Sequence, residues 1–277
     1  MISFSELGHK YQSLLPDGID WISVSTLCGQ FKQPFDPIAA SIKCSKKKTS
    51  KWYGMKPEEI QWVWKKKADK SCVTGTWYHN VQEQEVLSQP FIEIYDTELP
   101  VVHPIFKDDV KLAPEQQLTD GIYPEHFCYL KTEGVCGQSD KVIVHKDTLY
   151  VGDYKTNEEL TTESYFNQYT GQHQMMLPPV QHLQDCKFEN YSLQLSTYAY
   201  MIQRQNPQLI NVVLEIEHVI FEYDGEDEWG YPIIKLNEKG EPIVADVKLY
   251  PVEYRKTEVK NMFAWLRENR NNLRKKS

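Results

Sequence analysis

The chain has 277 residues and a net charge of −8, with 40% hydrophobic and 25% charged residues. This composition is that of a globular protein with a sizeable core, and 17 tyrosines with seven tryptophans argue against disorder. No apolar run approaches the roughly 20 residues that span a bilayer, and the first residues lack the pattern of a signal peptide. We therefore expect one cytoplasmic domain over residues 1–277 without membrane contact.

Residues 41–70 form a basic segment, with ten lysines against three acidic residues and a local balance of +7. Aromatic residues alternate with these lysines: Trp52, Tyr53, Trp62 and Trp64. Aromatic rings among cations can stack on bases while the cations contact phosphates. The alternative is that the lysines only coat solvated helix faces. Six cysteines without a C-x-x-C pair are expected to be free thiols, mostly in the core.

Hydrophobic spacing and turn residues predict the elements in chain order. The first part, residues 1–72, is expected to hold a short strand in residues 21–27 and helices over 36–48 and 57–70. The middle part, residues 73–205, is expected to begin with a helix from Thr74-Gly75 to about Leu87, and strand pieces follow over 90–120. Further strands are expected over 126–136, 138–145 and 148–155, then a polar stretch over 156–188 and a helix over 190–204. The last part, residues 206–277, is expected to hold strands over 210–222 and 245–252 and a helix over 254–274. Such an order predicts a mixed α/β fold, with a central mixed sheet flanked by helices.

The run GQSDKVIVHKDTLYVGDYKT, residues 137–156, is typical of a β-hairpin with Lys146-Asp147 at its tip. That register pairs Val144 with Leu149, Val142 with Val151, Asp140 with Asp153 and Gln138 with Lys155. Opposed residues and i, i+2 neighbours lie on one face of a sheet. One face of the hairpin is therefore expected to be apolar near the turn and ionic at the open end.

Two opposed carboxylates, Asp140 and Asp153, repel each other across the ladder. A divalent cation held by their oxygens would offset that repulsion. Lys155 reaches the same space, where it can hold or deprotonate a water. Metal, carboxylates and lysine together supply what phosphodiester hydrolysis needs. The alternative is an exposed strand end with an ordinary Asp–Lys pair.

Several short motifs resemble those of RecB-type nucleases, which belong to the PD-(D/E)XK superfamily together with phage lambda exonuclease. Gly137-Gln-Ser-Asp140, Asp153-Tyr-Lys155 and Gln194-x-x-x-Tyr198 are similar to the G-x-x-D, D-x-K and Q-x-x-x-Y series. Gly75-x-x-x-His79 matches an upstream G-x-x-x-H that opens a helix. The four motifs follow the family order, although Ser139 replaces the proline and Asp153 the more frequent glutamate. The resemblance implies a restriction-endonuclease-like core.

The resemblance also implies a role for each matching position. Asp140 and Asp153 would be metal ligands, together with His79 and the backbone carbonyl of Tyr154. Lys155 would position or activate the attacking water. Gln194 and Tyr198, which share a helix face, would line the active site. Weaker candidates are Glu83, one turn beyond His79, and Glu133.

The implied activity is that of a deoxyribonuclease dependent on Mg²⁺ or Mn²⁺, acting on single strands or duplex ends, and we favour an exonuclease encoded by a phage. No iron–sulfur cluster is expected, because no cysteine follows Cys186. Within residues 156–188, a flap over the substrate strand is one hypothesis, and it would be formed by Phe166, Tyr169, His173 and residues 175–179. Two alternatives stay open: a non-catalytic nucleic-acid-binding or assembly protein on a nuclease fold, and an interaction protein organised by zinc at His173, His182 and Cys186.

Overall fold

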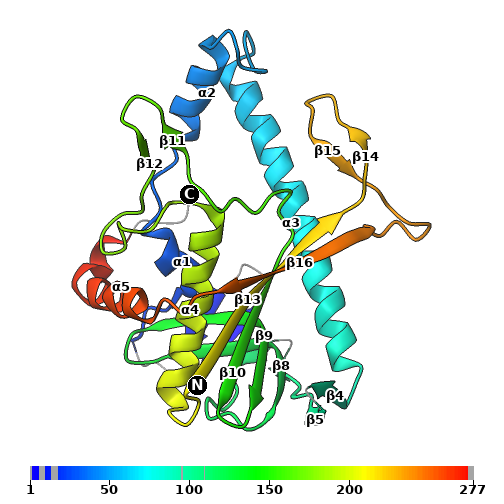
Figure 1. The fold of residues 1–277 in the computed structure, drawn as a ribbon, viewed down its shortest axis with the longest axis vertical. Coiled ribbons are helices and arrows are strands. Elements are labelled where there is room, and N and C mark those ends of the chain that lie inside the picture. The colour runs from blue at the N-terminus through cyan, green and yellow to red at the C-terminus, as the bar shows by residue number, and fades with distance from the viewer. Residues whose placement is uncertain (1, 6–9, 14–17, 95, 109, 274–277) are drawn as a thin grey trace.

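A six-stranded mixed β-sheet forms the centre of the molecule, with helices against both faces (Figure 1). The computed structural model describes residues 2–5, 10–13, 18–94, 96–108 and 110–273. The strands of this sheet are β3 (Ile22–Ser23), β8 (Gly121–Leu130), β9 (Val135–His145), β10 (Thr148–Lys155), β13 (Asn211–Phe221) and β16 (Val244–Val252). The mixed α/β class and the central mixed sheet are therefore confirmed.

Strands β8, β9 and β10 follow one another as antiparallel neighbours, and β10 then pairs in parallel with β13. Helix α4 (Lys187–Gln205) lies in the connection between β10 and β13, as a parallel crossover requires. The predicted pairs of Val144 with Leu149 and of Val142 with Val151 are confirmed, with the turn at Lys146-Asp147. The predicted pairs of Asp140 with Asp153 and of Gln138 with Lys155 are wrong, because the ladder ends at Lys141–Gly152.

Alternation along β9 divides the core between the two faces of the sheet. Val142 and Val144 join the main hydrophobic cluster, to which α4 contributes Leu193 and Ala199. Helices α1 (Val24–Gly29) and α5 (Lys256–Asn269) add to the same cluster. Ile143, one residue out of phase, belongs instead to a cluster on the opposite face that includes Val86 of helix α3 (Pro57–Leu87). The sheet is thus enclosed between α4 and α3.

Helix α3 is a single element of 31 residues, so the two helices expected over 57–70 and from Thr74 to Leu87 are wrong as separate elements. Thr74-Gly75 does not start a helix, because the backbone continues in helical conformation through both residues. A Cβ at Gly75 would lie 3.3 Å from Thr156 Oγ1. The glycine therefore lets α3 pass close to the end of β10.

Two other boundaries differ from the expectation. The strand expected over 21–27 ends at Ser23, because the Ser23 hydroxyl accepts the N–H of Thr26 and caps α1. The turn between β8 and β9 lies at residues 131–134, so the strand expected over 126–136 is wrong in its second half. Helix α5 is followed by the 3-10 helix η1 (Arg270–Asn272), and residue 274, the expected helix end, lies outside the described residues.

Three projections extend from one end of the sheet (Figure 1). Helix α2 (Pro37–Lys46) packs on the first half of α3 and forms the first. The hairpins β11 (Phe166–Asn167) with β12 (Gln172–His173), and β14 (Tyr223–Glu226) with β15 (Pro232–Ile234), form the second and third. The β11–β12 hairpin lies in the polar stretch expected to be a flap: Tyr169 at its tip is 99% exposed, whereas Met176 beyond it is buried.

Smaller sheets complete the fold. Strands β1 (Ile2–Ser5), β2 (Lys10–Ser13), β6 (Ile105–Lys107) and β7 (Val110–Leu112) form one, and β4 (Phe91–Ile94) with β5 (Thr97–Pro100) another. The six cysteines are free thiols, and Cys28, Cys128, Cys136 and Cys186 are buried, as expected. None of the helices in the described part of the chain combines the length and apolar character needed to cross a membrane.

Candidate active site

The ladder between β9 and β10 opens at the predicted ionic end. Its pairs run from His145–Thr148 to Lys141–Gly152. Strand β8 pairs along the opposite edge of β9, with an interruption between the pairs Pro124–Lys141 and His126–Ser139. The edge of β9 that β10 leaves is taken up again by β3, at Val135 and Cys136. Residues 137–140, the G-x-x-D stretch, lie in the opening between β10 and β3. There the backbone N–H of Tyr154 donates to Asp140 Oδ2 at 2.8 Å, in place of a strand pair.

Three side chains meet at this opening with atoms suited to bind a metal ion. They are His79 of α3, Glu125 of β8 and Asp140 of β9, and their ligand atoms all lie within 4.8 Å of one another. His79 Nδ1 is 3.5 Å from both Glu125 Oε1 and Asp140 Oδ1. The structure therefore brings two of the predicted ligands, His79 and Asp140, together with a glutamate that the motifs did not identify.

Glu125 holds a strained backbone conformation. Its φ is 46°, in the left-handed region that non-glycine residues seldom adopt. Lys111 Nζ donates to the Glu125 carbonyl at 2.7 Å and supports that conformation. Pro124, an irregular residue inside a strand, is the sequence feature that could have drawn attention to this position. Glu83, the weaker predicted ligand, has Oε1 3.8 Å from Lys111 Nζ and lies outside the group of three.

Asp153 and Lys155 form an ion pair at the end of β10. Asp153 is 2% exposed and, by strand alternation from Val151, faces the α4 side of the sheet. Lys155 Nζ lies 4.6 Å from the centroid of the Tyr191 ring on α4. Burial lowers the pKa of Lys155, but the charges of Asp153 and Asp140 outweigh it and raise that pKa above its ordinary value. Lys155 is therefore a cation at neutral pH.

Negative charge dominates the electrostatics of the opening. Burial and the charge of Asp153 raise the pKa of Asp140 well above its ordinary value, although His79 acts in the opposite direction. Burial also disfavours protonation of His79, but the hydrogen bond with Glu125 and the charge of Asp140 raise its pKa to about 9. The positive charge of His79 and Lys155 does not balance the negative charges of Glu125, Asp140 and Asp153. A bound divalent cation would supply the missing positive charge.

Helix α4 supports the opening from behind. Tyr198 is 5% exposed, and a Cβ at Gly137 would lie 2.8 Å from Tyr198 Cε1. The glycine of the G-x-x-D motif is thus required by the tyrosine of the Q-x-x-x-Y motif, which packs directly on it. Gln194 lies one turn earlier on α4 and is half-buried. Tyr198 is not among the residues that line the pocket at this opening.

The three candidate ligands line a pocket of about 270 Å³, together with Glu83, Tyr154 and Glu217. The Tyr154 ring stands edge-on to the His79 imidazole, with centroids 5.7 Å apart, and so limits how that imidazole turns. Glu217 is engaged by Lys141 at 2.8 Å. The pocket gives a ligand access to the metal-binding atoms.

The other candidate residues lie away from this opening. Glu133 pairs with Arg267 at 3.2 Å in the turn after β8. The residues considered for zinc have separate partners: His173 contacts the Ser164 carbonyl, His182 contacts Glu258 and Cys186 contacts the Thr162 carbonyl. Among the described residues, His79, Glu125 and Asp140 form the one group of three or more side chains arranged to hold a metal ion. The alternative of zinc at His173, His182 and Cys186 finds no such group of side chains in the described part of the chain.

Comparisons with protein-family models, with curated proteins and with solved structures give no match to this chain. The site provides two acidic ligands and an imidazole around one point, and beside them a buried carboxylate paired with a lysine.

Proposed function

We propose that the protein is a deoxyribonuclease of the PD-(D/E)XK superfamily that depends on Mn²⁺ or Mg²⁺, with its active site at the opening between β9 and β10. One observation carries the proposal. The imidazole of His79 and the carboxylates of Glu125 and Asp140 converge from α3, β8 and β9 at the opening where the Asp153–Lys155 ion pair also lies. A central mixed sheet flanked by helices surrounds them and supports a restriction-endonuclease-like core.

The residues present fit a divalent metal ion. Carboxylate oxygens suit Mg²⁺ and Mn²⁺, and the imidazole nitrogen favours Mn²⁺ of the two. Burial and then the charge of Asp153 raise the pKa of Asp140, and such an ion would offset both effects. When bound, the ion would neutralise the phosphate and lower the pKa of a coordinated water. The ligands of this ion would be His79, Glu125 and Asp140. Asp153, outside that group, would remain paired with Lys155.

The backbone N–H of Tyr154 positions the ligand Asp140, and Lys155 stabilises negative charge on the substrate. The N–H of Tyr154 holds one oxygen of Asp140 and leaves the other toward His79. Lys155, a cation beside Asp153, stabilises the negative charge that develops on the phosphate as the water attacks. Its raised pKa disfavours a role as general base. We propose DNA as substrate, cut from strand ends, and a phage as the source of the protein.

Cleavage of labelled linear and circular DNA in Mn²⁺ tests the proposal. We compare the wild type with Lys155→Ala and Glu125→Gln, and with Glu133→Gln as matched control, because Glu133 lies away from the opening. The wild type should degrade linear DNA and spare circular duplex. Each of the two site variants should lose about 100-fold or more in rate, as when one charge-stabilising group is removed, and the control should not.

Two results would refute the proposal. A wild type that cleaves no DNA in any divalent metal would favour the alternative of a nucleic-acid-binding protein without catalysis. Cleavage that Lys155→Ala and Glu125→Gln leave unchanged would place the active site elsewhere. Cleavage of circular duplex would contradict only the exonuclease part of the proposal.

A further inference from the structure

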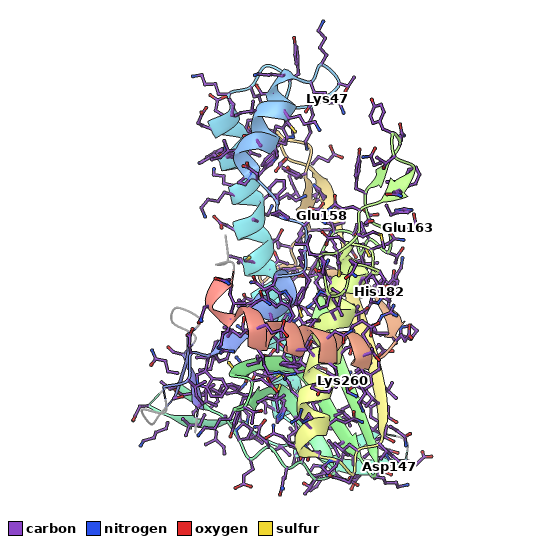
Figure 2. The ribbon with its side chains drawn as sticks, turned by 90° about the vertical axis from the view of Figure 1, so that its left-hand side faces the viewer. Lys47, Asp147, Glu158, Glu163, His182 and Lys260 are labelled. Carbon is purple, nitrogen blue, oxygen red and sulfur yellow. The ribbon has the colours of Figure 1, made fainter. Side chains whose placement is uncertain are left out.

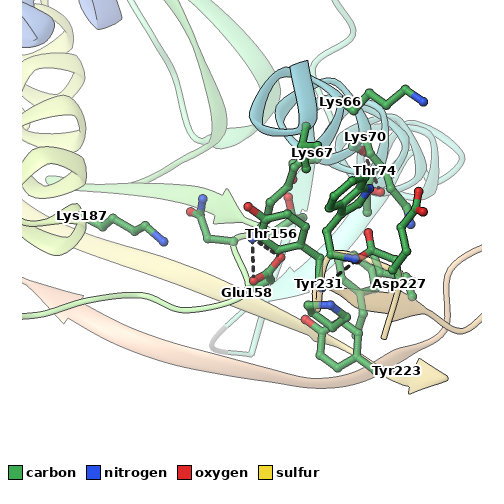
Figure 3. A pocket seen from close by; sticks show the side chains of 18 residues that line it. Lys66, Lys67, Lys70, Thr74, Thr156, Glu158, Lys187, Tyr223, Asp227 and Tyr231 are labelled. Atoms are coloured by element: carbon green, nitrogen blue, oxygen red, sulfur yellow. Dashed lines mark hydrogen bonds and ion pairs between the residues drawn. The ribbon is translucent and has the colours of Figure 1, made fainter. Parts of the chain in front are cut away.

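A second pocket, of about 430 Å³, lies between α3 and the β14–β15 hairpin (Figure 3). We call it the lysine–aromatic pocket. Helix α3 contributes Lys66, Lys67 and Lys70, and the hairpin and its turn contribute Tyr223, Trp229 and Tyr231. Thr156, Asn157 and Glu158, which follow β10, complete the wall between them. The pocket combines cations and flat rings, the two groups that hold a single-stranded nucleic acid.

The aromatic side of this pocket is held in place before any ligand binds. Asp227 Oδ1 accepts the backbone N–H groups of Trp229 and Tyr231, both at 2.9 Å, and so shapes the turn of the hairpin. Lys51 Nζ donates to the Trp229 carbonyl at 2.8 Å and ties this turn to the helical projection. A ring that is already ordered loses little entropy when a base stacks on it.

Cations surround the same rings. Lys51 Nζ and Lys67 Nζ each lie 4.0 Å from the centroid of the Tyr231 ring. Lys67 also pairs with Glu158 at 2.9 Å. Lys66, the residue before it, and Lys70, about one turn later on α3, line the pocket as well. Tyr223 is 41% exposed. A ring open to solvent beside lysines suits a base with its phosphate.

The sequence indicated stacking by all four aromatic residues of the basic segment, but two of them, Trp52 and Trp64, pack in the interior. Trp52 is buried with Ile60 and Val63, and Trp64, Trp229 and Tyr231 pack against them in a small separate core. Tyr53 and Trp62 are 54% and 51% exposed, and Lys66 Nζ lies 3.8 Å from the Trp62 ring centroid. The buried rings join the helical projection to the hairpin, and the pocket lies along that junction.

The pocket is next to the candidate active site, because consecutive residues of the chain belong to the two sites. Thr156, on its wall, is the residue after Lys155. Asn157, also on the wall, accepts the Tyr191 hydroxyl at 2.7 Å, and Lys155 lies against that same Tyr191 ring. A strand whose phosphate lies at Lys155 therefore has its neighbouring nucleotides within reach of the pocket.

We propose that the lysine–aromatic pocket binds a nucleotide of an unpaired strand beside the scissile phosphate, with the base against Tyr223 and the phosphate at Lys70. The inference rests on the proposed function and adds that the substrate strand is single-stranded where it is cut. A base-paired strand cannot present a free base to the rings, which makes this a statement about substrate class.

Binding of two oligonucleotides, measured by fluorescence anisotropy in EDTA, tests the inference. One is a 15-nucleotide oligothymidylate and the other an abasic strand of equal length, which keeps the phosphates and lacks the bases. The wild type should bind oligothymidylate about tenfold more tightly, as one or two stacked bases would give. Tyr223→Ala should remove most of that preference, Tyr223→Phe should keep it, and Lys70→Ala should weaken both strands severalfold.

Matched controls lie far from the pocket: Phe91→Ala, an exposed aromatic residue on β4, and Lys260→Ala, an exposed lysine on α5. Both should bind as the wild type does. Equal affinity of the wild type for the two strands would overturn the inference, and so would a base preference that survives Tyr223→Ala. Unfolding temperatures check each variant, and Lys70→Ala tests the pocket independently if Tyr223→Ala does not fold.

Failure of this inference differs from failure of the proposed function. If Lys155→Ala stops DNA cleavage while Tyr223→Ala keeps the base preference, the nuclease stands and the pocket is refuted. If neither wild type nor variants cleave DNA, yet Tyr223→Ala loses the preference, the pocket stands as a nucleic-acid site and the nuclease is refuted.

Discussion

The protonation of Asp140 and His79 depends on their burial and on the charges of the neighbouring side chains. Burial and Asp153 raise the pKa of Asp140, and neighbouring carboxylates raise that of His79 to about 9 despite its burial. Below about pH 9 the metal-free protein therefore carries a proton on His79, and protonation of Asp140 extends to higher pH than for an ordinary aspartate. A metal ion has to displace these protons, because it binds the deprotonated ligands.

Manganese affinity should accordingly rise with pH. While His79 alone is protonated, each unit by which the pH rises toward about 9 should strengthen binding by up to about tenfold, since one proton is released per ion bound. Calorimetric titration between about pH 6.5 and 8.5, in buffers of different ionisation heat, measures both the affinity and the protons released. His79→Asn should weaken binding and flatten the profile. A wild-type affinity that stays constant over this range would contradict the account.

Gly137 has no side chain, and this allows Tyr198 of α4 to pack directly on the backbone of β9. The β9 backbone approaches Tyr198 so closely that a methyl group at Gly137 would have to displace the ring. The motif spacing identified both residues, but the contact between them depends on how α4 crosses the sheet. That crossing is set by packing between residues distant in the sequence, which spacing alone does not contain.

Gly137→Ala should destabilise the protein by about 1–3 kcal/mol, the usual cost of overpacking a core. In a Tyr198→Ala background the same substitution should cost almost nothing, because the ring that it meets is gone. Urea unfolding of the four proteins of this double-mutant cycle gives the coupling energy. Equal costs in both backgrounds would show that Tyr198 does not pack on Gly137.

At the scale of elements, the β9–β10 hairpin was predictable and its surroundings were not. Alternating valines and leucines define the hairpin register, and local alternation is all that this requires. The opening at residues 137–140 also needs β3, which comes from more than 100 residues earlier in the chain. Glu125 reaches the site only through the pairing of β8 with β9, and no motif marks it. The β14–β15 hairpin was not predicted at all.

The polar stretch after β10 combines two elements of different stability. Tyr169, at the hairpin tip, is 99% exposed, whereas Met176 is 2% exposed and belongs to the main core. Deletion of residues 168–180 would remove Met176 and Val180 from that core, so it would test folding and not a flap. Only the tip of the hairpin can be altered without that loss.

Single substitutions separate the two elements. Met176→Ala should cost about 2–5 kcal/mol of unfolding free energy, because it leaves a cavity in the core. Tyr169→Ala should change stability by less than about 0.5 kcal/mol, as for an exposed side chain without packing partners. Thermal and urea unfolding measure both. A large loss of stability in Tyr169→Ala would mean that the hairpin tip packs on the protein.

At the scale of the whole molecule, positive charge is concentrated at the end of the projections, although the net charge is −8. Lys46, Lys47 and Lys48 are exposed at the end of α2, and Lys47 lies at the far end of the molecule from Asp147, at the β9–β10 turn (Figure 2). The lysine–aromatic pocket lies between that end and the active site opening. A nucleic acid strand held by both would run along α3.

Replacing Lys46, Lys47 and Lys48 by alanine should reduce the salt dependence of single-strand binding. The slope of log affinity against log salt should fall in magnitude by about 0.7 for each lysine that contacts a phosphate, hence by up to about 2. The control replaces Lys107, Lys146 and Lys260, which are exposed elsewhere and change the net charge equally. Anisotropy titrations at several salt concentrations give the slopes. Equal slopes for the two triple variants would place the strand away from α2.

The proposed active site requires a divalent ion between the side chains of His79, Glu125 and Asp140, which meet where β9 and β10 separate. A crystal structure with Mn²⁺, using its anomalous scattering, tests this most directly. We predict a peak about 2.0–2.4 Å from His79, Glu125 and Asp140, with their side chains turned toward it. A saturating concentration of Mn²⁺ that leaves no peak there, with His79 still hydrogen-bonded to Glu125, would contradict it.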